Sequence, residues 1–274
     1  MSFHAMIDLF ARAWPALLSY DAGRNVGVVC AVFLAVLVVL RLTRWRTRIQ
    51  ARVPSMADYT REIFYSLQTG AVFLAIGLGT FIGAEAGVFT MVAAGPGDHV
   101  LPLIGGSLAL IIAHDAYFYW THRLMHHPRL FRFFHRGHHR SRAPTPFAAY
   151  AFAWPEAIVQ ALFLPLMAFL MPVHATALFV FLTFMIVRNV VGHAGLELYP
   201  RWFGLSPLTA WITTTTHHDL HHESARANYG LYFRWWDQLM LTEHPHYLAR
   251  FERATLGRSG RRRGARAADV HNEV

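Results

Sequence analysis

Three stretches of the chain contain closely spaced histidines: His122-Arg-Leu-Met-His126-His127, His135-Arg-Gly-His138-His139 and His217-His218-Asp-Leu-His221-His222. Thirteen of the 18 histidines lie between His114 and His222. Spacings of three and four residues place imidazoles on one face of a helix. Because a neutral imidazole binds a metal ion without adding charge, this repeated spacing predicts a metal site built on short helical segments.

The number of histidines predicts more than one ion. His122 and His126 share a helix face, whereas His127 lies about 140° around the helix from His122, so the spacing leaves open which of His126 and His127 is the ligand. His193 adds an isolated candidate. The full set of candidate ligands is His122, His126, His127, His135, His138, His139, His193, His218, His221 and His222. These neutral nitrogen ligands suit iron, zinc or copper better than magnesium or calcium.

Two simpler explanations account for less of the pattern. A single histidine on an apolar face is usually a core residue, and a histidine-rich tract can be a loose metal-binding segment. Neither explains why His-x-x-His-His occurs at His135 and again at His218, each time in a non-repetitive context. A specific metal site is therefore the stronger interpretation.

The composition predicts a membrane protein. Hydrophobic residues make up 54% of the chain and charged residues only 15%, compared with roughly 25% in soluble domains. The single cysteine, Cys30, excludes a disulfide framework and cysteine-ligated zinc or iron–sulfur sites. The net charge of +9 comes from arginines beside apolar segments, and no nucleic-acid motif occurs, so anionic lipid headgroups explain it better than nucleic acid.

Apolar stretches and arginines together predict a topology. The candidate spans are residues 25–40, 63–84 and 99–120, followed by a proline-punctuated hairpin at 157–173 and 175–187. Basic residues crowd the segments 41–61, 123–142 and 188–266, and none occurs between Arg61 and Arg123 or between Arg142 and Arg188. The positive-inside rule places these basic segments in the cytoplasm, together with all the histidine motifs. We therefore expect an all-α integral membrane protein of a bacterial inner membrane. It would have about four to five membrane helices and a cytoplasmic histidine-rich di-metal cap.

Three regions are expected along the chain. Residues 1–107 would carry the N-terminal membrane helices, and residues 108–245 the catalytic domain. Residues 246–274 are basic and are expected to form a disordered tail that touches headgroups.

The order of the motifs resembles the fatty acid hydroxylase superfamily, in particular its sterol C-5 desaturase-like branch. The similarity covers residues 115–242, nearly half of the chain. Besides the histidine motifs, it is carried by Asp115-Ala-Tyr-Phe-Tyr-Trp-Thr-His122, Pro144-Thr-Pro-Phe-Ala148, Asn189-Val-Val-Gly-His193, Asn228-Tyr-Gly230 and Trp236-Asp237. Any one motif would be weak on its own, but their combined order and spacing are highly specific.

This resemblance implies an oxidoreductase with two iron ions that uses dioxygen to hydroxylate or desaturate a lipid, a sterol, a fatty-acyl chain or a related compound. No cytochrome-type His-Pro-Gly-Gly motif occurs, so a separate ferredoxin or cytochrome-type electron donor is expected. The alternatives are a metal-binding pseudoenzyme without turnover and a hydroxylase of carotenoids, sphingolipids or alkyl ethers. Retention of every histidine motif favours an enzyme.

Several polar residues near the motifs are candidates for orienting the ligands. Carboxylates and amides often hold metal-bound imidazoles through the second ring nitrogen, which makes Asp115, Asn189 and Asp219 candidates for this role. His114 is expected to have a structural or substrate-side role, and His217 is a second-choice ligand. No catalytic residue separate from the metal ligands is expected.

Overall fold

The computed structural model describes residues 48–92 and 99–256, which are almost entirely helical. The elements are α3 (Met56–Glu85), β1 (Met91–Val92), α4 (Val100–Met125), α5 (Pro128–Phe134), η2 (His138–Arg140), η3 (Pro146–Tyr150), α6 (Trp154–Ala161), α7 (Phe163–Leu170), β2 (Val173–His174), α8 (Ala175–Gly192), α9 (Arg201–Leu205), α10 (Thr215–Ser224), α11 (Trp235–Leu239) and α12 (Tyr247–Thr255). The predicted helical fold is confirmed, apart from two strands of two residues. The predicted span 25–40 lies outside the described residues.

Three of the described helices are long and apolar enough to cross a membrane: α3, α4 and α8, with 30, 26 and 18 residues. They correspond to the predicted spans at 63–84, 99–120 and 175–187. The predicted span at 157–173 is instead two short helices, α6 and α7, which meet at Leu162. Pro165 in the first turn of α7 has no N–H to continue the hydrogen bonding of α6, which explains the break.

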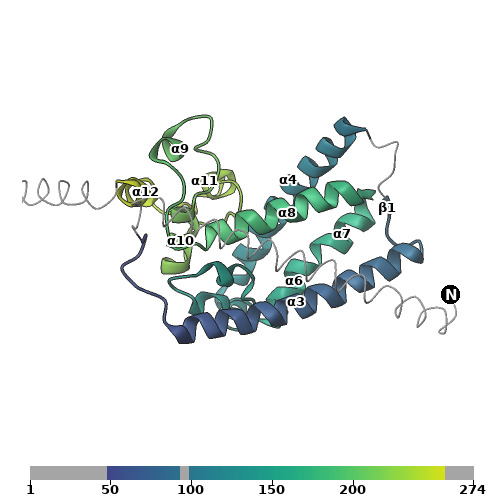
Figure 1. The fold of residues 1–274 in the computed structure, drawn as a ribbon, viewed down its shortest axis with the longest axis horizontal. Helices are drawn as coiled ribbons and strands as arrows, with labels where there is room; N and C mark the ends of the chain where they lie inside the picture. The colour runs from purple at the N-terminus through teal and green to yellow at the C-terminus, as the bar shows by residue number, and fades with distance from the viewer. Residues whose placement is uncertain (1–47, 93–98, 257–274) are drawn as a thin grey trace, which may run out of the picture.

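The long helices are arranged so that one end of the molecule carries the cap. Figure 1 shows α3 beginning and α8 ending at the end where α9 to α12 gather, while β1 lies at the opposite end. There β1 pairs in parallel with β2, through Met91 opposite Val173. α8 packs against α4, and α3 packs against α6 and η3. The main core lies between these helices and includes Leu110, Phe163 and Phe181.

The cap is ordered beyond the expected catalytic boundary. We predicted a disordered tail from residue 246, and this is wrong for α12 (Tyr247–Thr255). Tyr247 and Phe251, four residues apart on one face, are buried against Leu220 of α10. Burial of this apolar stripe offsets the entropy lost on ordering the helix. Residues 257–274 lie outside the described part of the chain.

Candidate metal centre

Nine histidines from distant parts of the chain converge in two buried groups at the cap end. The five-histidine group contains His122, His126, His135, His139 and His221, and the four-histidine group contains His138, His193, His218 and His222. Within each group, one ring nitrogen from every residue lies within 4.8 Å of all the others. Each group therefore has the size of a single-ion coordination site.

The helical spacing explains how the motifs divide between the groups. Each pair spaced i, i+4 lies in one group: His122 with His126, His135 with His139, and His218 with His222. In the second and third triplets, the remaining member at i+3, His138 or His221, belongs to the other group, because the i+3 and i+4 positions point in directions about 100° apart. One triplet can thus contribute to two adjoining ions.

The nitrogen-to-nitrogen distances fit bound metal. In the five-histidine group, the Nε2 atoms of His122 and His135 are 2.9 Å apart, and that of His139 is 3.0 Å from that of His221. Two nitrogens bound to one ion at about 2.1 Å lie roughly 3.0–3.4 Å apart for octahedral to tetrahedral angles. In the four-histidine group, both ring nitrogens of His222 are buried without a hydrogen-bond partner. Such an orphaned imidazole is explained by a ligand that binds it.

The second ring nitrogen of several ligands is held by a backbone carbonyl. His122 Nδ1 lies 2.9 Å from the oxygen of Tyr229, His221 Nδ1 lies 2.7 Å from that of Ala227, and His193 Nδ1 lies 2.8 Å from that of Asn189. Because a carbonyl oxygen can only accept, Nδ1 donates in each case. This tautomer leaves the Nε2 lone pair directed into the group.

A carboxylate outside the set of residues predicted from sequence holds a fourth histidine of the two groups. Glu156 Oε1 lies 2.6 Å from His135 Nδ1, and both side chains are at most 2% exposed. One sequence signal could have found it: Glu156 is the only charged residue between Arg142 and Arg188. An isolated acid in an apolar stretch is costly to bury without a partner, so it points to a specific contact.

The Asn228-Tyr-Gly230 motif forms the loop that supplies two of these carbonyls. Asp237 Oδ1 and Oδ2 accept from the backbone N–H groups of Tyr229 and Gly230, each at 2.8 Å. A Cβ atom at Gly230 would lie 2.6 Å from a backbone oxygen and 2.9 Å from Asp237 Oδ2, so only glycine fits there. The Trp-Asp motif therefore acts on His122 through the Tyr229 loop.

Burial keeps the ligands of α10 ready to bind a cation. Desolvation lowers the pKa of His218, His221 and His222 well below the usual range, and nearby histidines lower it further. These imidazoles are neutral at physiological pH and need not lose a proton before they coordinate.

The structure does not bring every predicted residue to the centre. His127 is exposed and caps α5, where its Nδ1 accepts from the N–H of Arg129 at 3.4 Å, so His126 is the residue that joins the five-histidine group. His217 is buried but belongs to neither group, and its Nε2 lies 3.6 Å from Asp237 Oδ2. In these two motifs, the histidine next to a member of a group, His127 beside His126 and His217 beside His218, thus points away from the groups.

The three predicted orienting residues have different surroundings. Asp115 is buried and accepts from the backbone N–H of Tyr232 at 2.9 Å, which ties α4 to the loop before α11. Asn189 orients His193 with its backbone oxygen, while its side chain donates to Ala149 O. Burial raises the pKa of Asp219 to about 7, and the side chain of Gln50 hydrogen-bonds to its carboxyl group.

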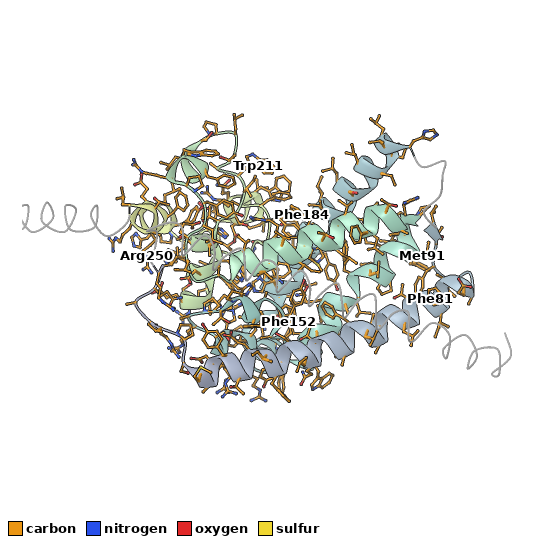
Figure 2. All side chains as sticks on the ribbon, viewed as in Figure 1. Phe81, Met91, Phe152, Phe184, Trp211 and Arg250 are labelled. Atoms are coloured by element: carbon orange, nitrogen blue, oxygen red, sulfur yellow. The ribbon has the colours of Figure 1, made fainter. Side chains whose placement is uncertain are left out.

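The two groups adjoin each other and a layer of aromatic side chains. The rings of His139 and His222, one from each group, have centroids 5.0 Å apart. Phe118 contacts His122 with centroids 4.8 Å apart, and Phe152 contacts His138 at 5.3 Å. Figure 2 shows Phe152 beside α3. The site therefore consists of two adjoining histidine groups with aromatic rings packed against both of them.

Comparison with protein families agrees with this geometry. Residues 107–242 match the family model described as fatty acid hydroxylase. This part of the chain belongs to the fatty acid hydroxylase family. The matched segment contains both histidine groups and the Trp-Asp motif.

Several curated relatives of this domain are named for the oxidation or desaturation of sterols. The chain is 33% identical over 139 residues to a C-4 methylsterol oxidase of Schizosaccharomyces pombe, covering 48% of this chain and 45% of that protein. It is 33% identical over 132 residues to a Delta(7)-sterol 5(6)-desaturase of Gibberella zeae, covering 48% and 39%. It is 31% identical over 137 residues to a lathosterol oxidase of Rattus norvegicus, covering 50% and 44%. The chain thus spans about half the length of these relatives or less, and no solved structure matches it.

Proposed function

We propose that this protein is a membrane-bound di-iron oxidoreductase that uses dioxygen to hydroxylate or desaturate a lipid. The observation that carries the proposal is the convergence of nine imidazoles, all buried except the half-buried His126, in two adjoining groups at the cap end of helices long enough to cross a membrane. The relatives named for sterol oxidation favour a sterol or a related lipid as substrate.

The five-histidine group would hold one iron and the four-histidine group the other. Neutral nitrogen ligands suit iron among the transition metals, and their burial excludes competing water. When bound, the two ions supply the activation of dioxygen that removal of hydrogen from an unactivated C–H bond requires. Hydroxylation consumes one dioxygen molecule, two electrons and two protons and releases one water molecule. Desaturation consumes the same reactants and releases two water molecules.

The chain's own residues position and enclose this chemistry. Glu156 and the carbonyls of Ala227 and Tyr229 fix the imidazole orientations. Phe118 and Phe152 cover the membrane side of the groups and keep water from the reacting carbon. We propose that the cap faces the cytoplasm of a bacterial inner membrane, where a separate ferredoxin or cytochrome-type protein supplies the electrons.

The test is lipid analysis by mass spectrometry of cells that express the chain or its His138→Ala variant under air. We expect a lipid with one added oxygen atom, or one lacking two hydrogen atoms, only with the unsubstituted chain. His246→Ala is the control, because His246 lies outside both groups. Two bound ions with no dioxygen-dependent product from any lipid would instead favour a metal-binding protein without turnover.

A further inference from the structure

A cavity of about 140 Å³ lies between the membrane-capable helices and is lined mainly by apolar side chains. Its walls come from α3, α4, the α6–α7 pair and α8. Some lining residues of α3 and α8, such as Gly70, Phe73 and Met185, are exposed or half-buried. Others, such as Phe118, Phe152 and Phe181, are buried. The cavity therefore opens toward the lipid-facing side and ends inside the protein.

One aromatic ring lies between the buried end of the cavity and each histidine group. Phe118, which lines it, contacts His122 of the five-histidine group. Phe152, which also lines it, contacts His138 of the four-histidine group. An apolar molecule in this cavity would be separated from the ligands by no more than these two rings.

One polar group in the cavity lacks a partner. Gln160 is 9% exposed, lines the cavity, and its amide Nε2 is buried without a hydrogen bond. A buried amide left unpaired costs on the order of 1–3 kcal/mol, so its retention indicates a ligand that satisfies it. Among the described residues that line it, none is Arg, Lys, Asp or Glu, which makes the cavity unsuited to a carboxylate or a phosphate.

We propose that this cavity binds the substrate of the reaction above, and that Gln160 selects a neutral lipid alcohol by hydrogen-bonding its hydroxyl group. The inference rests on the proposed function for the identity of the occupant as a substrate. A hydroxyl group both donates and accepts, so it can pair with either end of the amide, whereas a hydrocarbon leaves the amide unpaired.

The position of Gln160 limits where the hydroxyl group lies in the cavity. Gln160 is four residues after Glu156 on α6, about 6 Å further along the helix, and Glu156 holds His135. The hydroxyl group is thus bound beside α6, one helical turn beyond the residue that holds His135.

Gly77 of α3 gives a way to close the cavity without disturbing the fold. It lines the cavity, and a Cβ atom built on it meets nothing within 4 Å. A leucine there fills cavity space and improves the helix propensity of α3. Gly79 also has open space around its Cβ position but does not line the cavity, so Gly79→Leu is the matched control.

The experiment measures equilibrium binding of radiolabelled lipids to the purified full chain in detergent micelles, with and without iron. Two matched pairs serve as probes, cholestanol with cholestane and hexadecanol with hexadecane, and cholestanol sulfate tests the effect of charge. In at least one pair, the unsubstituted chain should bind the alcohol roughly 3- to 10-fold more tightly than the hydrocarbon. Gln160→Leu should bring that ratio close to one, which a merely structural role would not do.

Gly77→Leu should weaken binding of alcohol and hydrocarbon alike by at least roughly 10-fold, while Gly79→Leu stays within about twofold of the unsubstituted chain. Unchanged metal content and elution volume would show that each variant is folded. An alcohol-to-hydrocarbon ratio unaffected by Gln160→Leu, equal binding of the sulfate, or normal binding by Gly77→Leu would each overturn the inference. Expected binding without turnover would contradict only the proposed function, whereas turnover insensitive to both variants would contradict only the assignment of the cavity.

Discussion

The contact between Glu156 and His135 offers a sharp test of the metal centre. When His135 coordinates through Nε2, its Nδ1 proton becomes a stronger donor, and the carboxylate 2.6 Å away is its best acceptor. Glu156→Gln keeps the side-chain shape and one accepting oxygen but removes the carboxylate. Glu156→Leu removes the acceptor entirely and leaves a buried N–H unpaired.

The structure sets the expected size of the effect. A hydrogen bond to a charged group contributes about 1.5–3 kcal/mol, and both partners here are buried from screening solvent. Because glutamine retains a neutral hydrogen bond, we expect Glu156→Gln to weaken iron binding at the five-histidine group roughly 10-fold and Glu156→Leu roughly 100-fold. The ion in the four-histidine group, which Glu156 does not contact, should be held as before.

The assay is a chelator titration of the purified iron-loaded protein, with bound iron measured by elemental analysis. We expect the two iron ions to be released in two steps, and only one of these steps should move to a lower chelator concentration in the Glu156 variants. Glu223→Gln is the matched control: Glu223 adjoins a ligand in sequence but pairs with Arg250 at the surface, at 2.8 Å. If Glu156→Leu released both ions at the same chelator concentration as the unsubstituted chain, the reasoning would be refuted.

Three further outcomes are expected. His221→Ala should lose about one of two ions and nearly all lipid oxidation, whereas His246→Ala should keep its bound ions and its lipid oxidation. Equal losses in the two variants would contradict the grouping of ligands. In a variant without Cys30, cysteines at Leu101 and Leu248, both exposed, should react with an impermeant thiol reagent from opposite sides of the membrane, with Leu248 on the cytoplasmic side. Labelling of both from one side would disprove the topology. Gly230→Ala should destabilise the fold by about 1–3 kcal/mol, measured by thermal unfolding, because its Cβ would lie 2.6 Å from a backbone oxygen. The same variant should bind metal more weakly. An unchanged melting temperature would argue against the loop's role.

The sequence by itself determined the features that depend on local geometry. Helical spacing is set within one turn of chain, so the His-x-x-x-His pairs could be recognised as sharing a face before any tertiary contact was known. The apolar stretches likewise predicted α3, α4 and α8, because the length and hydrophobicity of a span are properties of one segment.

Tertiary structure decided the rest, because it depends on contacts between segments far apart in the chain. The choice of His126 over His127, and the division of the motifs into two groups, follow from which helix faces meet. The acceptor for His135 comes from α6, 21 residues away, and that for His122 comes from a loop 107 residues away. Burial in α12 depends on α10, which no local pattern reveals. Spacing fixes the direction of a side chain along its own helix, but only packing determines what that side chain meets.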